Sequence, residues 1–273
     1  MNEMPIVGAQ HVASRLMRES LMDKTLIAAT EAPVRAILPA LNVIQIGGLS
    51  IMDRGHKALL PLLDEIVANQ ATYTQVVGVG PGVRARHILS VGLDLGLPTG
   101  ALATLAAKSS AQNAYMVSCL LASHGFVYLE APFIVQLLPA MLAAARGAVF
   151  NGIPPYDLWE HPPVVGKLPP HGSDAGSYLV GEAFGARSVI LVKDVDGLYT
   201  ADPKTHPDAK FIAEVGAAEL LAMDLPTLPI EPVVLTLLTK TKLVRSIRIV
   251  NGLVPGNLTR ALAGDTVGTL IHA

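Results

Sequence analysis

Two glycine-bearing segments have the residue types that bind phosphate or another oxyanion. Gly47-Gly48 and Gly80-Pro81-Gly82 each follow a short apolar run, and a helical pattern begins soon after each. A turn from a strand into a helix leaves backbone N–H groups and the positive end of the helix dipole free at one place. The glycines could also serve only to make tight turns. Because Arg84 and Arg86 follow the second turn, we favour an anion site and predict contacts at Gly47, Gly48, Gly80, Gly82 and Arg84.

The segment 193–204 reads Lys-Asp-Val-Asp-Gly-Leu-Tyr-Thr-Ala-Asp-Pro-Lys. It resembles the nucleotide-binding segment of the amino acid kinase family, whose members include UMP kinase, acetylglutamate kinase and aspartokinase. The resemblance implies an α/β fold, a three-layer αβα sandwich with a largely parallel central sheet. It also implies that this segment holds adenine and ribose, and that Asp174 positions phosphate or magnesium. The implied nucleotide contacts are Lys193, Asp194, Asp196, Gly197, Tyr199, Asp202, Pro203 and Lys204.

Further motifs narrow the resemblance to the bacterial molybdenum storage proteins and extend it over nearly the whole chain from Ile37 to Ile271. These motifs are Met52-Asp53-Arg54-Gly55, the segment 82–87, Gln112-Asn113, Pro154-Pro155-Tyr156 and the segment 251–259. That family forms a hexameric cage of two related subunit types, binds ATP with magnesium, and stores molybdate or tungstate as polynuclear oxide clusters. The resemblance therefore implies ATP, Mg²⁺ and molybdate or tungstate as ligands, and a homo- or hetero-hexamer with a paralogous subunit.

The chain departs from this pattern at two positions that would carry positive charge. The kinase family and both storage subunit types ordinarily have a lysine where this chain has Gln45, and storage subunits usually have an arginine where it has Gly172. An amide can donate a hydrogen bond, but it cannot neutralise charge on a transferred phosphoryl group, so transfer should weaken more than binding. We therefore expect a slow or silent ATPase with Gln45, Asp174 and Lys193 as the catalytic candidates. Lys193 or Lys108 could supply the missing charge.

Two histidines and two oxygen-bearing side chains are the candidates for contacts with the metal-oxide cargo. The proline-rich segment 153–171 contains His161 and His171, and neutral imidazole is a good ligand for a high-valent metal oxide. The resemblance adds Glu130 and Gln136, near the cage wall. For either histidine, the alternative is an ordinary hydrogen-bonded side chain.

Strand and helix patterns alternate along the chain, which predicts a parallel sheet covered on both faces, with ligands outside the carboxyl ends of its strands. Strands are predicted at 41–46, 74–79, 126–129, 148–150, 188–192, 246–250 and 267–271. Helices are predicted at 59–67, 84–95, 102–123, 134–146 and 173–184, with two more before residue 246 and one after Gly256. Residues 1–40 are predicted to form an N-terminal arm with one helix around 11–30, and residues 41–273 a single α/β domain.

The composition limits the partners of the chain. Lysine and arginine total 20 against 22 acidic residues, so no global field attracts nucleic acid or an anionic membrane. Hydrophobic residues make up 51% and charged residues 15%, yet every apolar run is interrupted before about 18 residues, which argues against a membrane span. A surface this poor in charge is what a large subunit interface requires, so we expect an oligomer.

The remaining features concern the compartment. Cys119 is the only cysteine, which excludes an intrachain disulfide and fits a reducing environment. The N-terminal residues show no export or transit pattern, so a cytoplasmic location is expected. Two other functions stay open at this point, a small-molecule kinase with UMP as the first substrate to test, and a catalytically silent ATP-binding scaffold subunit.

Overall fold

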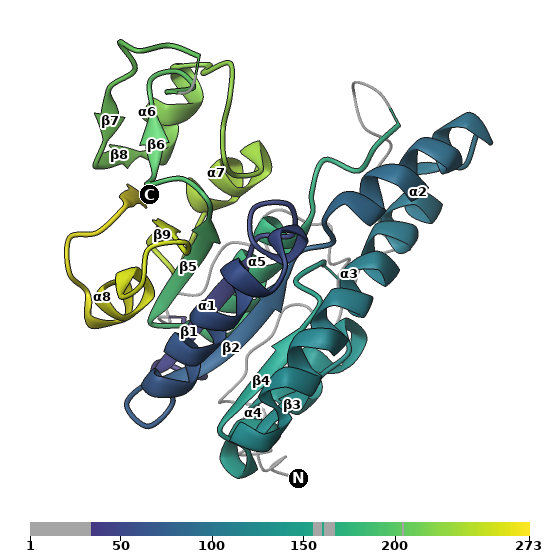
Figure 1. The fold of residues 1–273 in the computed structure, drawn as a ribbon, viewed down its shortest axis with the longest axis vertical. Helices are drawn as coiled ribbons and strands as arrows, with labels where there is room; N and C mark the ends of the chain where they lie inside the picture. The colour runs from purple at the N-terminus through teal and green to yellow at the C-terminus, as the bar shows by residue number, and fades with distance from the viewer. Residues whose placement is uncertain (1–33, 155–159, 161–166, 204) are drawn as a thin grey trace, which may run out of the picture. The chain divides into compact units, whose positions relative to one another are not determined.

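A central sheet carries the glycine turns at the carboxyl ends of two neighbouring strands. The computed structural model describes residues 34–154, 160, 167–203 and 205–273, and within them eight strands form one sheet in the order β3-β4-β2-β1-β5-β9-β10-β8 (Figure 1). The strands are β1 (Leu41–Ile46), β2 (Thr74–Val79), β3 (Phe126–Tyr128), β4 (Gly147–Phe150), β5 (Ser188–Lys193), β8 (Glu214–Gly216), β9 (Ser246–Asn251) and β10 (Thr269–His272). Neighbours are parallel except β10 and β9.

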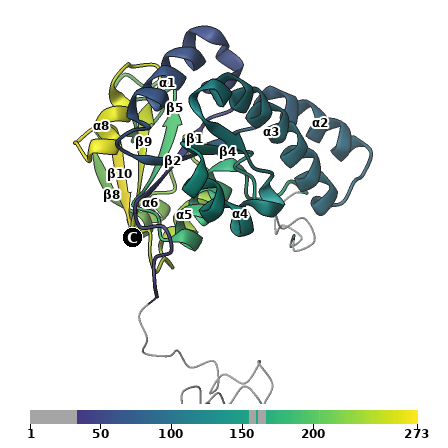
Figure 2. The ribbon, with the colours of Figure 1, turned by 90° about the horizontal axis from the view of Figure 1, so that it is seen from below.

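Helices cover both faces of this sheet, as Figure 2 shows. One face packs on α1 (His56–Asn69), α3 (Thr99–Leu121) and α8 (Asn257–Ala263). The other packs on α4 (Ala131–Ala144), α5 (Ser173–Phe184), α6 (Ala217–Ala222) and α7 (Pro232–Leu238). The helix α2 (Val83–Asp94) lies against α3. The predicted three-layer αβα sandwich with a largely parallel sheet is therefore confirmed.

Side chains along β1 alternate between the two helix layers. Val43 belongs to the apolar core beneath α5, whereas Ile44 and Ile46 belong to the core beneath α1 and α3. Because successive strand residues point to opposite faces, this period places Gln45 on the α5 face. All six β1 residues are buried, as is typical of a parallel strand covered on both sides.

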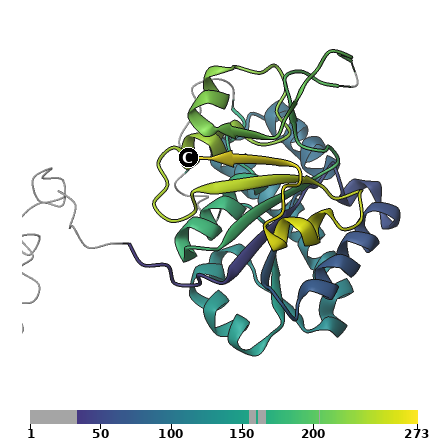
Figure 3. The ribbon, with the colours of Figure 1, turned by 90° about the vertical axis from the view of Figure 1, so that its left-hand side faces the viewer.

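The C-terminal strand adds the antiparallel pairing. Figure 3 shows β10 in yellow beside β9, followed by β5 and then β1 in purple. A separate pair of short antiparallel strands, β6 (Leu198–Tyr199) and β7 (Phe211–Ile212), holds the segment that follows β5. The sequence patterns did not predict β6, β7 or β8, because two or three residues are too few to show a period.

The long elements agree with their predicted positions, while several ends differ. The helix α5 covers 173–184 as predicted, whereas α3 and α4 begin at Thr99 and Ala131, three residues before their predicted starts. The helix α1 continues through Pro61. Residues Arg35–Ala273 form one compact unit, and the helix predicted around 11–30 lies outside the described residues. Among the helices of the described segments, none has the length and apolar character needed to cross a membrane.

Candidate functional site

The two glycine turns lie directly against each other. They follow β1 and β2, which pair in parallel register. A Cβ atom on Gly48 would lie 2.2 Å from the Gly82 nitrogen, and one on Gly80 would lie 2.6 Å from the Gly48 nitrogen, so the approach requires glycine. Within the described chain, no backbone carbonyl accepts a hydrogen bond from the N–H of Gly48 or Gly82. These two N–H groups are therefore available to a ligand anion.

A cavity of about 350 Å³ opens beside these turns, at the carboxyl ends of the parallel strands. The glycines share its lining with residues of α2, α5 and β5, and with two residues before α7. The residues that carry its polar and charged groups are Ser50, Arg86, Ser173, Asp174, Lys193, Asp194 and Glu231. The structure thus brings Gly47, Gly48 and Gly82 together with Asp174, Lys193 and Asp194 at one place.

Lys193 and Asp174 form a buried ion pair in this cavity. The Lys193 ammonium donates to both carboxylate oxygens of Asp174, at 2.8 and 2.7 Å. The side chains are only 12% and 4% exposed, so little water screens the pair. Asp174 lies in the first turn of α5, where a negative charge is stabilised by the helix dipole. This pairing takes up much of the positive charge that Lys193 could offer a phosphate.

Glu231 occupies the N-terminus of α5. Its carboxylate accepts hydrogen bonds from the N–H groups of Gly172 at 2.7 Å, Ala175 at 3.0 Å and Asp174 at 3.1 Å. Burial of the Glu231 carboxyl, with the Asp174 carboxylate beside it, raises the pKa of Glu231 to about 7, although the three N–H groups act in the opposite direction. Sequence patterns did not reveal this residue, which comes 57 positions after Asp174.

Asp53 caps the other helix that borders the cavity. The Val83 N–H, in the first turn of α2, donates to the Asp53 carboxylate at 2.6 Å. A Cβ atom on Gly82 would lie 2.5 Å from the same carboxylate. The starts of α2 and α5 are therefore both capped by carboxylates of the chain itself, while the N–H groups of Gly48 and Gly82 stay available.

A second cavity of about 260 Å³ lies along the segment that follows β5 and shares Asp194 and Pro229 with the first. Its lining includes Gly197, Tyr199, Asp202 and Pro203 among the predicted nucleotide contacts. The Tyr199 ring packs edge-on against Phe211, with centroids 5.4 Å apart. Because they share these two lining residues, the two cavities lie next to each other, and together they fall within the size range of small-molecule sites.

The other predicted nucleotide contacts of the segment 193–204 do not line these cavities freely or lie outside the described residues. The Asp196 carboxylate accepts a hydrogen bond from the Asn251 amide at 2.8 Å and does not line either cavity. Arg54 forms an ion pair with Asp194 at the cavity wall. Lys204 lies outside the described residues.

Gln45 and Arg84 do not line the cavity. The Gln45 side chain is fully buried beneath α5, where its oxygen accepts a hydrogen bond from the Ser177 hydroxyl and its amide donates to the Ile46 carbonyl at 3.0 Å. Arg84 is exposed on α2 and the cavity is lined instead by Arg86, two residues later. The structure thus places Gln45 behind the cavity rather than in it.

The predicted cargo contacts are spread over different parts of the chain. Glu130 lines a third cavity, of about 170 Å³, Gln136 is exposed on α4, and the His171 imidazole pairs with the Glu160 carboxylate. His161 lies outside the described residues. In the described part of the chain, no three His, Cys, Asp or Glu side chains are grouped to hold a metal ion.

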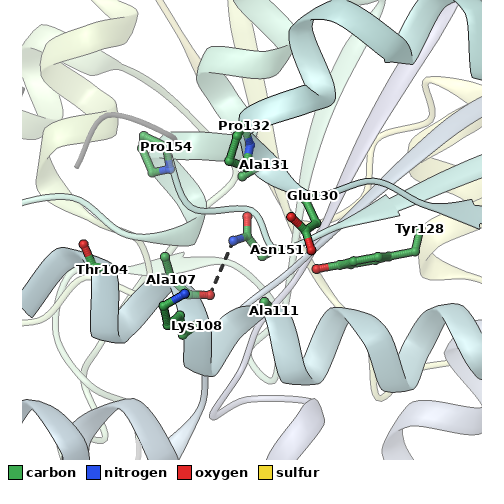
Figure 4. A pocket seen from close by; sticks show the side chains of 10 residues that line it. All are labelled: Thr104, Ala107, Lys108, Ala111, Tyr128, Glu130, Ala131, Pro132, Asn151 and Pro154. Atoms are coloured by element: carbon green, nitrogen blue, oxygen red, sulfur yellow. Dashed lines mark hydrogen bonds between the residues drawn. The ribbon is translucent and has the colours of Figure 1, made fainter. Parts of the chain in front are cut away.

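The third cavity lies between α3 and the start of α4, at the ends of β3 and β4 (Figure 4). Lys108, Tyr128, Glu130 and Asn151 supply most of its polar side-chain groups. The Asn151 amide donates to the Ala107 carbonyl at 3.4 Å, and its buried oxygen has no partner among the described residues. Burial and the nearby Glu130 carboxylate raise the pKa of Tyr128. The cavity therefore combines one cationic, one anionic and several neutral polar groups.

The sequence and the fold of the chain are similar to those of known proteins. The model of the amino acid kinase family matches residues 40–255, most of the chain. The chain belongs to the amino acid kinase family. Its sheet agrees with that of the uridylate kinase from Archaeoglobus fulgidus, whose structure superposes with a TM-score of 0.63 at 21% identity, over 84% of this chain and 99% of that one. At this identity the likeness supports the fold alone.

Two curated relatives from this family differ in their described roles. The chain is 48% identical over 259 residues to the molybdenum storage protein subunit beta of Azotobacter vinelandii, covering 94% of this chain and 96% of the relative. It is 30% identical over 207 residues to a uridylate kinase of Hyperthermus butylicus, covering 73% of this chain and 83% of that protein. The chain is thus a close homologue of a storage protein subunit within a kinase family.

Proposed function

We propose that the chain is a subunit of a molybdenum or tungsten storage assembly that binds ATP with magnesium and hydrolyses it at most slowly. The observation that carries this proposal is the 48% identity to a storage protein subunit over 94% of the chain. Because that relative is a subunit beta, we expect a hexamer in the cytoplasm, either a homo-hexamer or a hetero-hexamer with a paralogous subunit.

The two neighbouring cavities support nucleotide binding. We assign adenine and ribose to the part along Tyr199 and Asp202, and the phosphates to the part beside Gly48 and Gly82. The carboxylates of Asp174 and Asp194 line the phosphate part, and Mg²⁺ in nucleotide sites is held by one or two carboxylates together with phosphate oxygens. The acidic lining suits a nucleotide whose charge is partly neutralised by such a cation.

Slow hydrolysis follows from the arrangement of the cations. Phosphoryl transfer depends on positive charge placed where negative charge develops. Lys193 is held by both oxygens of Asp174, and Gln45 is buried behind the cavity. Arg86, on the exposed side of α2, also lines the cavity. Among the described lining residues it is the cation that is not held by a carboxylate.

We assign molybdate or tungstate contacts to Glu130, Gln136, His161 and His171. Glu130 shares its cavity with Lys108, whose ammonium would attract an oxyanion to a place where a carboxylate can accept protons from it. The cargo thus meets a positive and a proton-accepting group together.

An assay with three arms tests this function against its alternatives. The purified chain is incubated with Mg-ATP alone, with added molybdate, or with added UMP, and bound ATP, ADP and phosphate are measured. The storage proposal expects bound ATP and little phosphate in every arm. ADP formation that depends on UMP would support a kinase instead, an alternative favoured by the uridylate kinase relatives. If phosphate is released only when the paralogous subunit is added to these mixtures, the chain is the silent scaffold.

A further inference from the structure

We propose that Glu231 is a specificity-determining residue of the nucleotide site, because its carboxylate holds the terminal phosphate of a triphosphate away from the start of α5. The site then binds ATP no more tightly than ADP. This inference rests on the proposed nucleotide binding and adds to it the residue that decides between the di- and triphosphate.

The start of α5 has the properties of a phosphate site, and Glu231 already uses them. A helix N-terminus binds an anion through its free N–H groups and its dipole. In α5, a helix of 12 residues, the N–H groups of Gly172, Asp174 and Ala175 all donate to the Glu231 carboxylate. A phosphate at this position would have to displace that carboxylate.

Gly172 leaves the space in which the Glu231 carboxylate lies at the start of α5. A Cβ atom on residue 172 would lie 2.6 Å from one Glu231 carboxylate oxygen and 3.2 Å from its carbon. Any larger side chain at this position would push the carboxylate away from α5. The Glu231 carboxylate can therefore lie here because residue 172 has no side chain. Gly172 in place of the usual arginine thus determines which group occupies this side of the phosphate cavity.

The charges near Glu231 strengthen its effect on a terminal phosphate. The Asp174 carboxylate lies beside it, and the Glu231 backbone N–H donates to that carboxylate at 3.4 Å. The Lys193 ammonium is already paired with Asp174. A terminal phosphate that approached α5 would therefore meet the Glu231 carboxylate and a lysine that is already paired with Asp174, while the other phosphates could still use the Gly48 and Gly82 N–H groups.

Titration calorimetry with Mg-ATP and Mg-ADP, at a pH above the Glu231 pKa of about 7 so that its carboxyl is ionised, tests the inference on the intact chain. The variants are Glu231→Ala, which removes the carboxylate, and Gly172→Ala, which displaces it by the added Cβ atom. Glu219→Gln, an exposed glutamate on α6, is the matched control. We expect the wild type and Glu219→Gln to bind both nucleotides equally, and both test variants to bind ATP about ten-fold more tightly with little change for ADP. Circular dichroism melting confirms that each variant folds.

Two outcomes would overturn the inference, and they are distinguishable. If the wild type binds both nucleotides and the ratio of the ATP and ADP dissociation constants stays the same in Glu231→Ala and Gly172→Ala, Glu231 does not determine the specificity, while nucleotide binding itself stands. If no variant binds either nucleotide, the proposed function fails and the inference fails with it.

Discussion

At the scale of single residues, the pairing of Lys193 with Asp174 governs what the cavity can do. The two side chains are nearly buried and joined by two hydrogen bonds. In a buried site, an ionised side chain without its partner destabilises the folded protein far more than the intact pair stabilises it. The pair therefore keeps the Asp174 carboxylate in position, and at the same time it withdraws the lysine from a phosphate.

Removal of the lysine alone should destabilise the protein more than removal of the pair. We expect Lys193→Met to lower the free energy of unfolding by about 3 kcal/mol, because it leaves the Asp174 carboxylate buried and unpaired. The double variant Asp174→Asn with Lys193→Met should recover much of this loss. Urea denaturation of the wild type, both single variants and the double variant measures the coupling. Additive losses in the double variant would contradict the account.

The contact between the glycine turns gives a second prediction at this scale. A Cβ atom on Gly48 would overlap the Gly82 backbone, so Gly48→Ala should separate the turns and reduce nucleotide affinity at least about ten-fold. Gly216→Ala is the matched control, because its Cβ atom would meet only ordinary contacts at 3.6 Å or more. Equal ATP affinity for the two variants in calorimetry would show that the turns do not hold the phosphates.

At the scale of elements, α5 is fastened at both ends by glutamates. Glu231 caps its N-terminus. Near its C-terminus, the Glu182 carboxylate accepts hydrogen bonds from Lys242 N–H at 2.6 Å, Val244 N–H at 2.7 Å and the Thr241 hydroxyl at 2.7 Å. The segment between α7 and β9 is thus held to the helix that carries Asp174.

The hydrogen bonds to the Glu182 carboxylate make the stability of the folded chain depend on pH. Burial alone raises the pKa of the Glu182 carboxyl, but hydrogen bonds from Val244, Lys242, Thr241 and Leu243 together lower it below 4.5. A lowered folded-state pKa contributes stability that is complete above the unfolded pKa and is lost as the pH falls through the folded pKa. Glu182→Gln should cost about 1 to 3 kcal/mol at neutral pH, and less below pH 4.5.

Thermal melts at several pH values measure this difference. The gap in Tm between the wild type and Glu182→Gln should be widest near neutral pH and narrow in acid. Glu219→Gln, which is exposed, should show no such gap. A gap that stays constant as the pH falls below 4.5 would show that the ionised Glu182 carboxylate is not what holds the segment.

Elements with a clear period could be predicted from the sequence, and contacts between distant residues could not. The bounds of α5 and of the strands β1 and β2 follow from local apolar patterns. The meeting of the two glycine turns follows from the parallel order of strands. The capping by Glu231 and Asp53 has no local signal, because each carboxylate reaches a helix that lies 30 or more residues away in the sequence. The burial of Gln45 follows from strand alternation, but only once α5 is known to cover that face.

At the scale of the whole molecule, several large apolar side chains of α4 and α3 are exposed in the part of the chain that the structure describes. The helix α4 contains no charged residue and exposes Phe133, Val135 and Leu137. On α3, Tyr115 and Leu120 are also exposed. Exposed apolar side chains on a helix without charged residues, such as α4, are typical of subunit interfaces, and the storage protein relative is itself a subunit.

A charge placed on this surface should reduce assembly. Val135 is 58% exposed, so Val135→Glu should leave the folded chain intact and lower the mass of the assembly in light scattering after gel filtration. Leu221→Glu, at a 40% exposed position on α6, is the control for an added charge elsewhere. An unchanged mass for Val135→Glu would exclude α4 from the interface.

The amount of metal retained by the protein tests the storage function most directly. The assembled protein is incubated with molybdate and Mg-ATP and passed through a desalting column, and molybdenum per subunit is measured by plasma mass spectrometry. The account predicts several molybdenum atoms per subunit that stay with the protein, and a clear loss when the nucleotide is omitted. A preparation that folds, assembles and binds ATP but retains no molybdenum or tungsten would contradict it.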